Sequence, residues 1–140
     1  MKRVAALALL LMSAATFAAT TAPRKVSVRE LLTHADKYDK QRVDVTGYYT
    51  AGMEDSQLWP SARAAKQSRS LDASIYIDPR IWDPQLRPHR PKDLLDPDYL
   101  RDRSVRVIGT FFSRGVLPSV VSTAPDGPSI TDVSYFRPVR

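Results

Sequence analysis

The pattern Val-x-Val-x-Gly-x-aromatic occurs twice in the chain, at residues 43–49 and again at residues 105–111. In both copies apolar residues alternate with other residues, which is the periodicity of a β-strand that buries one face. Glycine inside a strand weakens pairing unless a bulge or a tight bend of the sheet requires it. Two strands of this design therefore predict a small, strongly coiled, closed sheet.

The remaining segments predict a mainly β fold with short helices. Further strands are expected at 56–59, 73–78, 118–121 and 130–136. Ser27 and Glu30 have the spacing of a capping box, and the apolar residues that follow predict an amphipathic helix from Val28 to about Lys37. Ser61 and Asp96 are the expected N-caps of two further short helical segments. We therefore predict a small OB-like antiparallel barrel of five to six strands with an N-terminal amphipathic helix, with a split β-sandwich as the alternative.

The first residues have the pattern of an export signal. Lys2 and Arg3 precede an apolar run that ends in small residues at Ala18, which predicts a signal peptide over 1–18. An uncleaved anchor is the alternative, because residues 4–23 carry no charge and have about the length of a spanning helix. After cleavage no stable membrane span is expected, and the product would be periplasmic or secreted.

The rest of the chain suits one domain. We predict a flexible N-terminus over 19–25 and a single OB-like domain over 26–140. Its proline-rich insertion at 79–97 contains too many prolines for a helix or a central strand. With 43% hydrophobic and 26% charged residues, the composition excludes disordered and polytopic membrane proteins.

Few residues of the chain fit catalytic or metal chemistry. The absence of cysteine excludes disulfides, thiolate nucleophiles and Cys-ligated zinc. The two histidines, His34 and His89, fall in unrelated segments, and the acidic residues over 93–102 lack the spacing of a calcium loop. No nucleophile motif or glycine-rich phosphate loop occurs. We therefore predict no catalytic residue, no metal site and no cofactor.

Aromatic and basic side chains supply the candidate binding residues, which are Tyr48, Arg80, Trp82, Arg87, Arg90 and Arg106. Trp82 lies among basic residues of the insertion, and an exposed Trp beside Arg is a typical hot spot for a protein partner. The alternative is that Trp82 folds back over the mouth of the barrel. Tyr48 shares a strand face with Asp44 and Thr46, while Arg106 lies on the outward face of the second repeat copy.

A larger platform of this kind would suit single-stranded nucleic acid. It would comprise Tyr48, Tyr76, Trp82 and Phe112 with Arg42, Arg80, Arg106 and Arg114. However, loss of Lys2 and Arg3 with the signal lowers the formal net charge from +6 to +4, and acidic residues are interspersed. Nucleic acid is therefore disfavoured, and the expected partner is a protein or glycan of the cell envelope.

Several segments resemble a family of small exported bacterial OB-fold-like proteins of uncharacterised role. The similarity covers 26–48, Glu54 with Leu58-Trp59, and Tyr99-Leu100 before 105–111. The resemblance implies the barrel but no catalytic residue. Lys40 departs from it, since the family pattern has glycine there. The sequence thus predicts an exported non-catalytic OB-like binding module, a protein-interaction or envelope accessory protein. An envelope enzyme or an oligosaccharide or nucleic-acid binder is the alternative.

Overall fold

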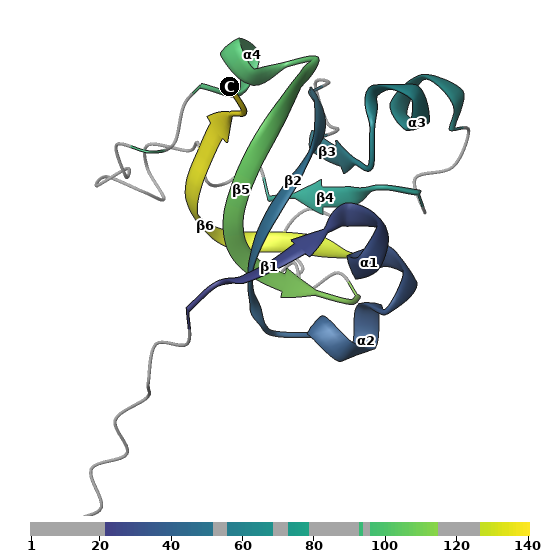
Figure 1. The fold of residues 1–140 in the computed structure, drawn as a ribbon, viewed down its shortest axis with the longest axis vertical. Helices are drawn as coiled ribbons and strands as arrows, with labels where there is room; N and C mark the ends of the chain where they lie inside the picture. Colours follow the sequence, from purple (N-terminus) through teal and green to yellow (C-terminus); the bar gives the residue numbers. More distant parts are fainter. Residues whose placement is uncertain (1–21, 52–55, 69–72, 79–92, 94–95, 115–126) are drawn as a thin grey trace, which may run out of the picture.

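The computed structural model describes residues 22–51, 56–68, 73–78, 93, 96–114 and 127–140 (Figure 1). The strands are β1 (Arg24–Ser27), β2 (Arg42–Ala51), β3 (Ser56–Trp59), β4 (Ile75–Ile77), β5 (Arg103–Phe112) and β6 (Ser129–Pro138). The helices are α1 (Val28–Thr33), α2 (Ala35–Tyr38), α3 (Ala62–Gln67) and α4 (Pro97–Leu100). The signal peptide expected over 1–18, most of the insertion and the strand expected at 118–121 lie outside the described residues.

Five strands close into a barrel, which confirms the predicted mainly β fold. The strands follow the order β2-β3-β4-β6-β5, and β5 pairs again with β2 through an antiparallel ladder that includes Val45 and Val107. β1 is an additional strand that pairs in parallel with the first half of β2. β4 and β6 are also parallel, whereas the sequence predicted an antiparallel barrel. Parallel neighbours need a crossover connection, and here β5 intervenes between β4 and β6 in the chain.

The barrel interior is filled by the apolar side chains of the two repeated strands and their neighbours. Tyr49 and Phe136 are fully buried and meet edge to face, with ring centroids 4.9 Å apart. Helical residues join this core, with Val28 and Leu31 from α1 and Leu100 from α4. Each such side chain contributes about 1.5–3 kcal/mol when it is fully buried.

The two repeated glycines are required by close approach. A Cβ atom at Gly47 would lie 2.8 Å from the side chains of Leu58 and Val28. A Cβ atom at Gly109 would lie 2.4 Å from the Cγ2 atom of Ile130, and the ladder between β5 and β6 shifts register at this point. Gly109 therefore lies opposite a bulge of β6, while Gly47 makes room for α1 and β3.

The long N-terminal helix expected from Val28 to about Lys37 is not confirmed as one element. The backbone leaves helical geometry at His34, which separates α1 from α2. Ser27 caps α1 as expected by accepting a hydrogen bond from the backbone N–H of Glu30. The Glu30 carboxylate does not complete a capping box, because it accepts a hydrogen bond from the Tyr38 hydroxyl. This bond lowers the pKa of Glu30.

Two further local expectations have clear outcomes. Arg24 and Lys25, expected in a flexible N-terminus, instead belong to β1. Ser61 and Asp96 accept hydrogen bonds from the first turns of α3 and α4, so both helix starts are confirmed. In the part of the chain that the structure describes, no helix has the length and apolar character needed to cross a membrane.

Candidate binding surface

The outward-facing side chains of four neighbouring strands form one continuous surface, which we call the outer face. Because side chains alternate along a strand, Val43, Val45 and Tyr49 fill the barrel while their neighbours point away from it. The outer face comprises Lys25 and Ser27 of β1, Asp44, Thr46 and Tyr48 of β2, Ser104, Arg106 and Ile108 of β5, and Tyr135 and Arg137 of β6.

Arg106 lies at the centre of the outer face and is held in place by Asp44. Its Nε and Nη2 atoms donate hydrogen bonds of 2.8 and 2.7 Å to the two carboxylate oxygens. The Asp44 side chain is only 8% exposed, whereas that of Arg106 is 43% exposed. The charged hydrogen bonds to Asp44 raise the pKa of Arg106. The pair thus fixes a permanently cationic, partly exposed guanidinium.

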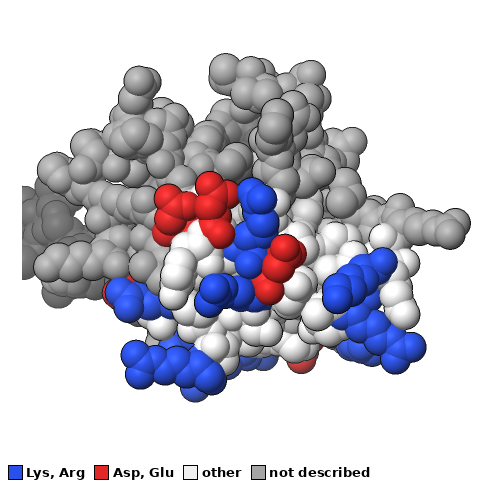
Figure 2. All heavy atoms as spheres, turned by 90° about the horizontal axis from the view of Figure 1, so that it is seen from above, with Lys and Arg blue, Asp and Glu red and all other residues white. Residues whose placement is uncertain are grey.

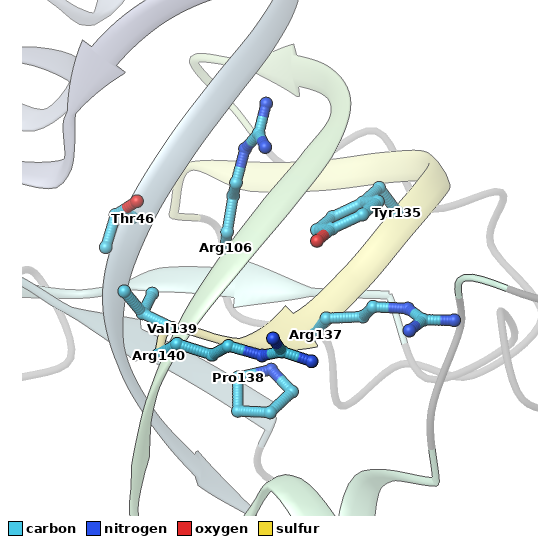
Figure 3. Close-up of a pocket in the computed structure, with 7 residues that line it drawn as sticks. All are labelled: Thr46, Arg106, Tyr135, Arg137, Pro138, Val139 and Arg140. Carbon is cyan, nitrogen blue, oxygen red and sulfur yellow. The ribbon is translucent and has the colours of Figure 1, made fainter.

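Tyr135 supports the same guanidinium from the neighbouring strand. The guanidinium carbon of Arg106 lies 5.2 Å from the centroid of the Tyr135 ring, within cation–π range. Figure 3 shows Arg106 rising from β5 between Thr46 of β2 and Tyr135 of β6. Asp44 accepts hydrogen bonds from the Nε and Nη2 atoms of Arg106 only. The Nη1 atom of Arg106 can therefore donate hydrogen bonds to a ligand.

Two hollows adjoin on the outer face and share Thr46 and Arg106. One has a volume of about 430 Å³ and is also lined by residues 135 and 137–140, including Arg137 and Arg140 (Figure 3). The other has a volume of about 680 Å³ and extends toward β1, α1 and Asp44. The outer face is therefore a shallow surface with a fixed cation at its centre.

Acidic and basic groups are mixed on and around this surface. Arg137 forms a 3.0 Å ion pair with Asp93, which neutralises part of the positive charge. Among the described residues, Lys25 and Arg140 form no ion pair. Figure 2, which views the molecule from above, likewise shows acidic side chains beside basic ones on the face seen there. In the described part of the chain, the outer face thus combines paired basic side chains with two, Lys25 and Arg140, that are not engaged in an ion pair.

The structure brings together only part of the predicted site. Arg106 and Tyr48 lie on the outer face, and Tyr48 is half-buried opposite Trp59. Arg80, Trp82, Arg87 and Arg90 fall in 79–92, outside the described residues, so their roles stay predictions.

Two residues of the aromatic and basic platform considered for nucleic acid are buried or make other contacts. Tyr76 is buried on β4, separated from Tyr48 by β3. Arg42 donates hydrogen bonds to the Asp132 carbonyl and to the Ser134 hydroxyl. Neither residue therefore extends the outer face.

Sequence reasoning missed the partners of Arg106. Asp44 and Arg106 occupy the same position in the two copies of the repeated strand pattern, 62 positions apart. Opposite charges at equivalent positions of two antiparallel neighbours were the available signal for this ion pair. Tyr135 had no comparable signal, because its place beside Arg106 depends on the bulged register of β6.

The arrangement is suited to binding. Within the described ranges, no group of three or more His, Cys, Asp or Glu residues is placed to hold a metal ion. A fixed guanidinium, a phenol ring and a free ammonium group are recognition groups for carboxylates and other anionic or polar ligands. No protein-family model matches the chain, and comparison with curated proteins finds no matching relative.

Proposed function

We propose that this chain is an exported, non-catalytic binding module that binds a protein partner in the cell envelope through its outer face. The observation that carries the proposal is the Arg106 guanidinium, which Asp44 holds on two hydrogen bonds between two adjoining hollows. Arg and Tyr are enriched among the residues that dominate binding energy at protein interfaces. A fixed side chain also loses little conformational freedom on binding.

The strand connectivity supports an OB-type barrel as the framework. Numbered within the barrel, the strands run in the order 1-2-3-5-4 and close between 4 and 1, with the third and fifth parallel. Barrels of this type bind ligands on an outward sheet surface and in adjacent loops. The charged start and apolar run of residues 1–18 support export, and intact mass of the periplasmic product tests that point by the loss of those residues.

Affinity capture from an envelope extract tests the function. The full chain serves as bait beside Arg106→Ala, Arg106→Lys and a control, Arg63→Ala, which removes an exposed arginine of α3. We expect a partner captured by the wild type and by the control but depleted about tenfold by Arg106→Ala. Arg106→Lys keeps the charge and loses the two-point geometry, so it should also weaken capture.

A second pair of changes separates the outer face from the insertion. The double variant Trp82→Ala, Arg87→Ala removes the hot spot predicted from the sequence. Capture lost in this variant alone would move the binding surface to the insertion. Identical capture by all baits would overturn the proposed binding module at both surfaces.

A further inference from the structure

The free edge of β1 is an unusual feature for a closed barrel. Closure gives each of the five barrel strands two neighbours, whereas β1 pairs only with β2. On the side away from β2, no described residue forms a backbone hydrogen bond with β1. Arg24, Lys25 and Ser27 are exposed. The strand therefore presents unpaired N–H and C=O groups, which are a template for another strand.

The charges around this edge indicate which strand would fit. Lys25 is the register partner of Asp44 and Ser27 that of Thr46, so both point to the outer face. Asp44 already binds Arg106 with both oxygens, and Lys25 forms no ion pair among the described residues. On the opposite face of β1, Arg24 lies over the Tyr38 ring at 5.1 Å. Among the described residues, Lys25 is thus a cation without an ion pair that lies beside the open edge and points to the outer face.

We propose that an extended acidic segment of a protein partner adds to β1 as a further strand, with acidic side chains at alternate positions facing Lys25 and the hollow beside Arg106. This inference rests on the proposed function and names the kind of partner for the same surface. The hollow of about 680 Å³ supplies the space, and it is lined by Lys25, Val26, Ser27, Glu30, Asp44, Thr46 and Arg106. Its two carboxylates are already engaged, that of Asp44 by Arg106 and that of Glu30 by the Tyr38 hydroxyl and by Lys37 at 3.7 Å. Backbone pairing supplies affinity, and the alternate side chains supply specificity.

A second copy of this chain fits the edge less well. Full antiparallel overlap of two β1 strands would gather Arg24 and Lys25 of both copies on one ladder of only four residue pairs. Like charges on paired strands destabilise the pairing. An acidic partner strand turns the same charges into attraction, and this complementarity selects the partner.

Fluorescence anisotropy with three labelled octapeptides tests the proposal on the full chain. The first alternates threonine and glutamate (the Thr/Glu peptide), the second replaces glutamate by lysine (the Thr/Lys peptide), and the third replaces threonine by proline (the Pro/Glu peptide). The Pro/Glu peptide keeps every carboxylate but loses half of its N–H groups and cannot form a regular strand.

We expect the Thr/Glu peptide to bind the wild type at least about tenfold more tightly than the other two peptides. Lys25→Glu should reverse the preference, so that the Thr/Lys peptide binds better than the Thr/Glu peptide. Lys66→Glu makes the same charge change at an exposed position of α3 and should leave the preference unchanged. A thermal melt confirms that each variant is folded.

Equal binding of the Thr/Glu and Pro/Glu peptides would overturn strand addition, because charge alone would then explain the affinity. No binding of the Thr/Glu peptide, or binding insensitive to Lys25→Glu, would also overturn the inference. The proposed function has its own test in the capture experiment with Arg106→Ala. A partner lost in that experiment would support the outer face even where the peptide result is negative.

Discussion

Lys40 adopts a backbone conformation that is unfavourable for a lysine. It lies in the turn between α2 and β2 with φ at 60°, in the left-handed region that disfavours side chains with a Cβ atom. The turn is held because the Lys40 backbone N–H donates a 2.7 Å hydrogen bond to the Phe111 carbonyl. Glycine adopts this left-handed conformation without the steric cost of a Cβ atom, so the backbone at this position favours glycine over lysine.

Lys40→Gly should therefore stabilise the protein. We expect the free energy of unfolding to rise by about 0.5–1 kcal/mol, because relief of left-handed strain exceeds the added entropy of the unfolded chain. Urea denaturation measures the change. Lys66→Gly within helix α3 is the control and should cost about 1 kcal/mol. A loss of stability in Lys40→Gly would contradict this account of the turn.

The buried Tyr49 hydroxyl makes the stability of the folded protein depend on pH in the alkaline range. Burial raises the pKa of Tyr49 to about 12, although its hydroxyl shares a 2.6 Å hydrogen bond with Ser56. Since the pKa in the folded state exceeds the ordinary value of 10.0, the stability from the neutral phenol is fully present below pH 10. It is lost as pH rises through the folded-state value.

Tyr49→Phe should reduce the loss of folding stability at alkaline pH. Between pH 10 and 12 we expect the wild type to lose about 2–3 kcal/mol more stability than the variant. At pH 7 the variant should be less stable by about 1 kcal/mol, because Ser56 loses its partner. Urea denaturation across this pH range gives both values. Parallel curves for the two proteins would show that Tyr49 does not control the alkaline transition.

At the level of elements, the features that depend on local sequence pattern were predicted correctly. The features that depend on contacts between distant segments were not. Alternation located β2 and β5, and side-chain caps located the starts of α1, α3 and α4. The break between α1 and α2 escaped prediction, because Glu30 turns to Tyr38 rather than back to the helix start. β1 and the parallel pairing of β4 with β6 depend on contacts remote in sequence, which periodicity does not encode.

The same distinction applies to the binding surface. Alternation correctly grouped Asp44, Thr46 and Tyr48 on one strand face. It did not show that Arg106 would reach Asp44, since that contact requires the register between β2 and β5. The repeat itself carried the missing information in the opposite charges at its second position, Asp44 and Arg106.

Gly109 faces the bulge of β6, and its replacement tests how closely the two strands must approach there. We expect Gly109→Ala to cost about 1–3 kcal/mol, because the new Cβ atom would lie 2.4 Å from Ile130 and 2.7 Å from the Thr131 carbonyl oxygen. Gly127→Ala is the matched control, since a Cβ atom there meets nothing within 4 Å. Thermal and urea denaturation compare the two variants. Equal stability of both would show that the strands separate at the bulge without cost.

At the scale of the whole molecule, closure of the barrel places the open strand edge and the fixed cation on the same side. Closure satisfies both edges of the five barrel strands and leaves the added strand β1 with an open edge. That edge lies next to Asp44 and Arg106, so unpaired backbone and a fixed cation share one surface. This combination supports the proposed binding role, while the core of the barrel supplies the rigid support.

A map of backbone amide shifts by NMR, recorded while the Thr/Glu peptide is added to the full chain, tests this surface most directly. We predict the largest shifts at Lys25 and Ser27 of β1, at Thr46 and around Arg106, with small shifts in α3. Shifts concentrated in α3 or in the insertion, with none in β1 and β2, would contradict the account.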